Sequence, residues 1–247
     1  MDLTTLHPND TTASVQALVQ KTLNLRTQYP SYPLPASICV FPNFTKTVKD
    51  ARAENVDLHV TATAACFPSS QSFLEVKLRE VELAVESGAD EIDVVMNLGL
   101  FFAGDYDGVK AEIEAVRKVC SGVVLKVILE TGILKTEENI RRASMIAMQA
   151  GADFIKTSTG KVEVNATPEA ARVMCGAIKD YFAETGRKVG FKAAGGISTA
   201  EDAVLYYNIV SEILGEEWLC KELFRLGVSR LGNSLMSAIE GREIKYF

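Results

Sequence analysis

Short runs of β-branched and other apolar residues alternate with longer amphipathic segments along the whole chain. Most of the short runs are apolar without a regular polar alternation, as is typical of parallel strands covered by helices on their outer face. Six runs are clear, and the first and last runs are weaker. We therefore expect strands at residues 2–6, 37–41, 57–64, 91–97, 123–130, 153–159, 189–194 and 228–232.

The longer segments carry signals for helix starts and ends. Thr167 before Pro168 predicts an N-cap followed by a first-turn proline, and Gly88 and Gly151 are each expected to end a helix. Two capping boxes are also predicted, in which a serine and a glutamate three residues later each bond the other's backbone amide. These are Ser72 with Glu75, and Ser198 with Glu201.

Alternation of strands and helices indicates βαβ units and a parallel sheet. Residues 86–93 and 148–156 both read as a helix end, a Gly-Ala-Asp turn and a strand, which is a repeated helix-to-strand connection. No linker or change of composition divides the chain, and 247 residues suit one closed barrel. We predict an α/β fold, a (β/α)8 TIM barrel forming a single domain over residues 1–247, with an open doubly wound sheet as the alternative.

Composition excludes several classes of protein. Hydrophobic residues make up 47% of the chain, which is ordinary for a globular core, and no apolar run approaches the roughly 18 residues of a membrane span. The first ten residues do not read as a signal peptide. Five scattered cysteines without a C-x-x-C pair predict neither a disulfide framework nor a zinc site. We expect a cytoplasmic protein without membrane contact.

Charge and histidine content narrow the set of ligands. A formal net charge of −6 disfavours nucleic-acid binding, which usually needs a basic stripe. The only histidines, His7 and His59, are far apart and fit no zinc-binding pattern, so a catalytic metal is not expected. A small anionic metabolite is compatible with the charge, because a few amides and lysines can bind one phosphate.

Charged residues interrupt strands that are otherwise apolar. Lysines occur at Lys126, Lys156 and Lys192, and carboxylates occur at Asp2, Asp93 and Glu130. A purely structural cluster of buried ion pairs is the simpler reading, but such a cluster is no more stable than an apolar filling. Six charges in one lumen favour chemistry: a lysine beside another ammonium loses its proton more easily and attacks a carbonyl as a neutral amine. Spacing alone leaves open which lysine is the nucleophile.

Glycines follow three of the expected strands, where loops of a barrel commonly bind phosphate. The three sites are Gly195-Gly196, Gly232-Asn233-Ser234 and Thr159-Gly160-Lys161, and the last of these adds a hydroxyl, an amide and a charge. Glycine also simply permits tight turns. The presence of three such loops favours an anion site.

Several segments together resemble the deoxyribose-phosphate aldolases. They are MDLTTL, EIDVV, LKVILETG, ADFIKTSTGK, VNATPE and GFKAAGGISTAEDA, in the same order from Met1 to about Asp202, with a weaker continuation through RLGNSL. The resemblance implies a class I aldolase that cleaves 2-deoxy-D-ribose 5-phosphate reversibly to D-glyceraldehyde 3-phosphate and acetaldehyde. It implies no metal and no organic cofactor, and small phosphosugar and aldehyde substrates as partners.

The same resemblance implies a role for each matching residue. Lys156 matches the lysine that forms the Schiff base, Lys192 the second lysine that lowers its pKa, and Asp93 the proton-relay carboxylate. Lys126 and Asp2 match supporting residues that orient the substrate and the relay. Cys39 matches a cysteine near the substrate, although a small buried apolar role is the simpler interpretation. Gly160, Lys161, Gly195, Gly196, Gly232 and Ser234 match phosphate-binding positions.

The chain departs from the resemblance in places. Ser198 replaces a basic residue found in many bacterial relatives, Ser234 stands alone where two serines are frequent, and a leading segment before Met1 is not present. Some relatives end in a mobile tyrosine, whereas Tyr246 is penultimate here. Relatives are often dimers, so we expect a homodimer in which the exposed-looking Tyr206 and Tyr207 lie at the interface.

Two other functions stay open on the sequence. One is a different phosphosugar barrel enzyme, either a transaldolase or an isomerase. An isomerase would rely on a glutamate base and a histidine, and neither His7 nor His59 lies at the carboxyl end of an expected strand. The other is a sugar-phosphate binder without catalysis, against which Lys156, Lys192 and Asp93 together argue.

Overall fold

Eight parallel strands form a closed barrel in the computed structural model, which describes residues 1–247. Each strand pairs with the next in sequence, and the eighth pairs with the first, so the predicted closed barrel is confirmed and the open sheet is wrong. The strands are β1 (Asp2–Thr4), β2 (Ser37–Val40), β3 (His59–Ala64), β4 (Glu91–Val95), β5 (Val124–Ile128), β6 (Phe154–Lys156), β7 (Gly190–Ala194) and β8 (Phe224–Val228).

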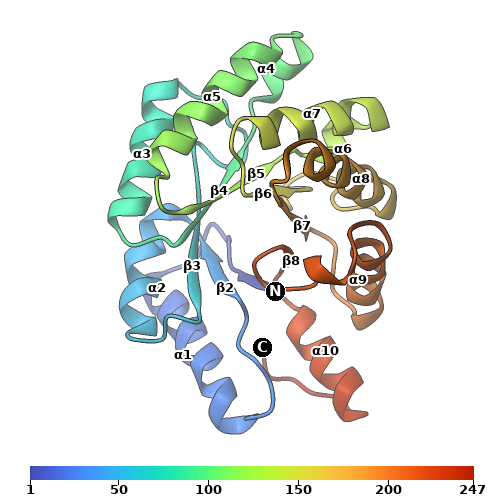
Figure 1. Cartoon of the computed structure of the whole chain (residues 1–247). Coiled ribbons are helices and arrows are strands. Elements are labelled where there is room, and N and C mark those ends of the chain that lie inside the picture. The colour runs from blue at the N-terminus through green and yellow to red at the C-terminus, as the bar shows by residue number, and fades with distance from the viewer.

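Helices surround the strands (Figure 1). They are α1 (Thr12–Gln28), α2 (Thr45–Arg52), α3 (Leu74–Glu86), α4 (Leu98–Phe102), α5 (Tyr106–Val119), α6 (Thr131–Leu134), α7 (Glu137–Gln149), α8 (Pro168–Thr185), α9 (Ala200–Leu214) and α10 (Leu231–Glu240), with short 3₁₀ helices η1 (Pro42–Phe44) and η2 (Glu216–Trp218). None of these helices combines the length and the apolar character that crossing a membrane requires.

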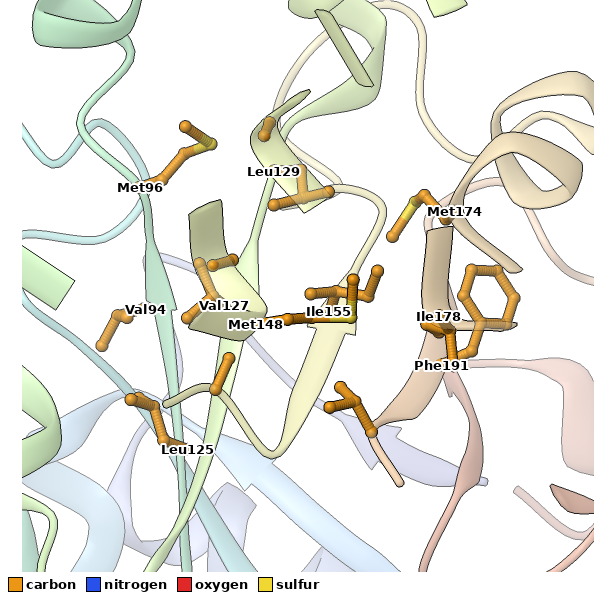
Figure 2. Packing of buried hydrophobic residues seen from close by; sticks show 14 of the residues in the cluster. Val94, Met96, Leu125, Val127, Leu129, Met148, Ile155, Met174, Ile178 and Phe191 are labelled. Carbon is orange, nitrogen blue, oxygen red and sulfur yellow. The ribbon is translucent and has the colours of Figure 1, made fainter. Parts of the chain in front are cut away.

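The main core lies between the outer face of the strands and the helices. Val127, Ile155 and Phe191, from three neighbouring strands, belong to one cluster of buried apolar residues with Met148 of α7 and Ile178 of α8 (Figure 2). Apolar residues cover the outer face, while the inner face carries the charges. Both faces of the strands are therefore buried, and their polar residues face the lumen rather than solvent.

The helix starts agree with the sequence at α8 and differ at two other helices. Thr167 accepts a hydrogen bond from the Ala170 amide, and Pro168 is the first helical residue, as predicted. Both predicted capping boxes are wrong. Helix α3 starts after Phe73 without a side-chain cap, and the capping box of α9 pairs Thr199 with Asp202, one residue later than expected.

The eighth strand was predicted four residues too late. Arg225 interrupts the apolar run before Val228, so the pattern of this segment does not indicate a buried strand. The Arg225 guanidinium lies in the lumen, where it donates to the carboxylates of Asp2 and Glu91. Leu231 and Gly232, expected to end the strand, instead begin α10. This shift moves residues 224–228 into the barrel wall.

The two tyrosines that were expected to be exposed differ in burial. The prediction is wrong for Tyr206, which is 4% exposed and packs in the core, whereas Tyr207 is 45% exposed. Tyr246 lies on the outside of the barrel, where its hydroxyl donates to the backbone carbonyl of Lys21 in α1. The side chain of Asn233 accepts bonds from the Tyr246 and Phe247 amides, so the last residues are bound along α10.

Candidate active site

Alternating residues of the strands project charged side chains into the lumen, as the period of two requires. All of them are buried, with at most 4% of any residue exposed. The cations come from β5, β6, β7 and β8 and the carboxylates from β1 and β4: Lys126, Lys156, Lys192 and Arg225, with Asp2, Glu91 and Asp93.

Asp93 is the point at which the three lysines meet. Its Oδ2 accepts from Lys156 Nζ at 2.7 Å and from Lys192 Nζ at 2.8 Å, and its Oδ1 accepts from Lys126 Nζ at 3.0 Å. Strand register explains the arrangement, because Lys156 pairs with Lys192 and Asp93 pairs with Lys126 across neighbouring strands. The nitrogens of Lys156 and Lys192 are therefore close neighbours on one oxygen.

A second layer of charges lies around Arg225. Its guanidinium donates to Asp2 Oδ1 at 2.5 Å and to Glu91 Oε1 at 2.8 Å. Asp2 Oδ2 lies 2.6 Å from Lys192 Nζ, and Lys126 Nζ donates to Glu91 Oε2 at 2.5 Å. Glu91 and Arg225 were not predicted from the sequence as members of this site. A charged residue inside each of the runs EIDVV and FRLGV was the available signal.

The three lysines differ in pKa because they differ in partners. Burial lowers the pKa of Lys156, and the positive charge of Lys192 lowers it further, whereas Asp93 and, to a smaller extent, Cys39 raise it. Burial acts in the same direction on Lys192, but Asp2 and Asp93 outweigh it and raise its pKa above the ordinary value. The pKa of Lys126 is raised as well, since Asp93 and Glu91 outweigh burial.

The balance of charges in the lumen also indicates that Lys156 has the lowest pKa of the three lysines. With every group ionised, the strand side chains Lys126, Lys156, Lys192, Arg225, Asp2, Glu91 and Asp93 carry four positive and three negative charges. Burial works against the charge of Asp93, yet Lys126, Lys156 and Lys192 hold the pKa of its carboxyl well below the usual range. Loss of one proton from Lys156 therefore leaves three ion-paired cations and three carboxylates. An unbalanced buried charge is unfavourable, so Lys156 is the lysine that this environment keeps neutral most readily.

Lys156 opens into a cavity of about 250 Å³ at the carboxyl ends of the strands. The loops after β6, β7, β8 and β1 form its wall, including Thr159, Gly160 and Lys161, Gly195 and Gly196, Ser229, and His7. This is the face on which barrel enzymes carry their active sites. His7 lies in this wall, contrary to the sequence prediction, whereas His59 begins β3 at the other end of the barrel and bonds Glu91.

Backbone amides without a protein acceptor line one side of this cavity. The N–H groups of Gly160, Gly195, Gly196, Ile197 and Ser229 donate to no carbonyl or side chain of the chain. The three glycines have positive φ of 78°, 84° and 81°, a backbone conformation that glycine adopts without strain. Several free amides around one hollow have the donors that an anion would need.

Other predicted substrate-binding residues lie away from the wall of this cavity. Ser234 Oγ accepts from the Ala200 amide at 2.9 Å, so it is engaged at the start of α9. Gly232 is buried against Phe247, whose ring would lie 2.5 Å from an added Cβ. Cys39 is fully buried in β2, where burial and the charge of Asp93 raise the pKa of its thiol. The structure does not bring these residues onto the cavity wall.

The family model of the DeoC/LacD family aldolases matches residues 1–208. The chain belongs to this family. The aldolase is 45% identical over 240 residues to the human deoxyribose-phosphate aldolase, covering 94% of this chain and 76% of the human protein. It is 44% identical over 257 residues to the mouse enzyme of the same name, with 97% and 77% covered.

A solved structure supports the relationship. The tetrameric deoxyribose phosphate aldolase of Aeropyrum pernix superimposes with a TM-score of 0.76 and 27% identity, over 96% of this chain and 88% of that one. This aldolase is therefore a carbon–carbon lyase on a (β/α)8 barrel. Its site carries neighbouring lysines, a shared carboxylate and a wall with free backbone amides.

Proposed function

We propose that this aldolase cleaves 2-deoxy-D-ribose 5-phosphate reversibly to D-glyceraldehyde 3-phosphate and acetaldehyde, through a Schiff base on Lys156. The observation that carries the proposal is the sharing of Asp93 Oδ2 by Lys156 and Lys192, with Lys156 facing the cavity. A neutral amine beside a fixed ammonium and a carboxylate has what imine formation needs.

Each step uses groups that the lumen provides. The Lys156 amine attacks C1 of the open-chain sugar, and the carbinolamine loses water to form the iminium. The C3 hydroxyl then gives up its proton, and the C2–C3 electron pair flows into the iminium, which releases glyceraldehyde phosphate and leaves an enamine. Protonation of C2 and hydrolysis release acetaldehyde and restore Lys156. Asp93, bonded to three lysines, is the group we assign to these proton transfers, with Lys126 and Asp2 orienting it.

The phosphate is assigned to the wall of free amides. Gly160, Gly195, Gly196 and Ile197 face the cavity together with the loop that carries Lys161. A dianion would accept hydrogen bonds from these amides and gain from the lysine charge. The Nζ of Lys161 donates to the Leu6 carbonyl at 2.6 Å, and phosphate would take over this donor.

Reductive trapping tests the nucleophile. Acetaldehyde and borohydride should add one ethyl group to the wild-type protein, at Lys156, and irreversibly inactivate it. The Lys156→Ala variant should neither be labelled nor turn over deoxyribose phosphate. Lys179→Ala, which alters an exposed lysine of α8, is the matched control and should behave as the wild type.

Two results would overturn the assignment. Labelling that persists in Lys156→Ala would place the Schiff base elsewhere. Activity that borohydride leaves intact would point to an isomerase, and binding of the sugar phosphate without release of acetaldehyde would point to a binder.

Assembly and location form a further part of the proposal. We infer one domain over the whole chain and a homodimer, for which α9 offers the exposed Val204, Leu205 and Tyr207. Sedimentation of the wild type and of Tyr207→Glu checks the dimer. A cytoplasmic location is supported by five cysteines that are all unpaired.

A further inference from the structure

Glu130 is a buried carboxylate that the steps above do not use. It follows β5, is 2% exposed, and has a left-handed backbone with φ 57° and ψ 60°. No lysine, arginine or histidine lies within ion-pair distance of its oxygens, although Lys156 is near enough to act on its charge. A buried carboxylate without a paired cation, on a strained backbone, costs folding free energy, which points to a functional role for this residue.

Both oxygens of Glu130 bind one residue of the neighbouring loop. Thr159 donates from its amide to Oε1 at 3.1 Å and from its hydroxyl to Oε2 at 2.5 Å. The Thr159 hydroxyl oxygen in turn accepts from the Lys161 amide at 3.0 Å. Glu130 therefore determines the orientation of Thr159, and Thr159 that of Lys161.

Gly160 lies between these two oriented residues. Its own amide has no protein acceptor, and it lines the cavity. Because Glu130 accepts from the Thr159 amide and the Thr159 hydroxyl accepts from the Lys161 amide, the Gly160 N–H is the loop amide left for a ligand. The Lys161 ammonium reaches the Leu6 carbonyl on the next part of the wall, so this loop contributes both an amide and a charge to the anion site.

We propose that Glu130 is a positioning residue that orients loop 159–161 for phosphate and thereby determines the preference for phosphorylated over unphosphorylated sugars. The inference rests on the proposed function for the identity of the substrate. Glu130 is not among the residues that line the cavity faced by Lys156. Burial raises the pKa of its carboxyl while the Thr159 bonds oppose this, as expected for an acceptor held by two donors.

The first test compares two substrates on one variant. In Glu130→Gln the side chain keeps its size, but its amide nitrogen cannot accept the second Thr159 bond. The ratio of kcat/KM for 2-deoxyribose 5-phosphate to kcat/KM for 2-deoxyribose should fall about tenfold, the effect of losing one charge-assisted bond. Glu138→Gln, the same change on an exposed glutamate of α7, should keep the wild-type ratio.

A second pair of variants examines the partner residue. Thr159→Val removes the hydroxyl and should lower the ratio as Glu130→Gln does, whereas Thr159→Ser keeps the hydroxyl and should restore it. This pair decides the question if Glu130→Gln fails to fold. An unchanged ratio in Thr159→Val would overturn the proposal.

The remaining outcomes separate this inference from the proposed function. Equal losses with both substrates, together with loss of acetaldehyde trapping, would show that Glu130 acts on the chemistry or the fold and would overturn the positioning role. Binding of inorganic phosphate, measured by calorimetry, does not depend on turnover. It should weaken about tenfold in Glu130→Gln even if the wild type cleaves neither sugar, and equal binding by both proteins would contradict the proposal.

Discussion

The number of carboxylates that each lysine contacts distinguishes three lysines that look alike in the sequence. Lys156 contacts one carboxylate, Asp93, whereas Lys192 contacts Asp2 and Asp93. Lys126 lies within 4 Å of Asp2, Glu91 and Asp93. Each ion-paired carboxylate favours the protonated amine. The least paired lysine is therefore the one that loses its proton.

Removal of Lys192 should move the pH dependence of imine formation upward. In the native site Lys192 lowers the pKa of Lys156. Lys192→Gln removes that repulsion and leaves Asp93 Oδ2 to Lys156 alone, so the pKa rises and less neutral amine is present at pH 7. The acidic limb of the pH profile for trapping with acetaldehyde should shift to higher pH by about 1 to 3 units.

The trapping rate measured between pH 5 and 10 checks this expectation. Lys179→Gln on the surface should leave the limb in place. A limb unmoved in Lys192→Gln would show that Lys192 does not lower the pKa of Lys156.

At the scale of elements, β8 determines how much room the neighbouring strand has. Gly227 pairs with Ala194 of β7, and its missing side chain leaves space for Lys192. A Cβ at this position would lie 2.9 Å from the Ala194 Cβ and 3.1 Å from the Lys192 Cε. The glycine therefore permits Lys192 to reach Asp93.

Gly227→Ala should lower both stability and activity. The added methyl displaces the Lys192 stem, and such overpacking costs about 1 to 3 kcal/mol of unfolding free energy. Urea unfolding and the rate of acetaldehyde release measure the two effects. Gly176→Ala, in α8 with open space around it, is the control and should be stabilised by about 0.5 to 1 kcal/mol. Wild-type activity in Gly227→Ala would contradict the steric argument.

At the scale of the whole molecule, closure of the barrel assembles the charge network. Asp2 and Arg225 are 223 residues apart in sequence and meet only because β1 pairs with β8. Burial opposes the ionised forms of Asp2, Glu91 and Asp93. The surrounding cations nevertheless keep the pKa of all three carboxyls below the ordinary values.

Acid should therefore unfold the barrel through these carboxyls. A carboxyl whose folded pKa is lowered stabilises the fold above its unfolded pKa of about 4, and this contribution is lost as pH falls below that value. The unfolding free energy in urea should drop between pH 5 and 3. The unfolding free energy of Asp2→Asn should fall less steeply with pH, because one such carboxyl is absent. That of Asp57→Asn, on the surface, should fall as steeply as in the wild type. Equal slopes in all three proteins would contradict this account.

The sequence by itself determined the repeating units of this aldolase and several of the charged residues in its lumen. Hydrophobic patterning is local, so seven strands and the barrel class followed from it, and Lys126, Lys156, Lys192 and Asp93 stood out as charges in apolar runs. Only the tertiary structure decided that Arg225 and Glu91 join the network and that Ser234 bonds α9. It also decided that Lys156 has the fewest partners, because protonation depends on distances between strands that are remote in the chain.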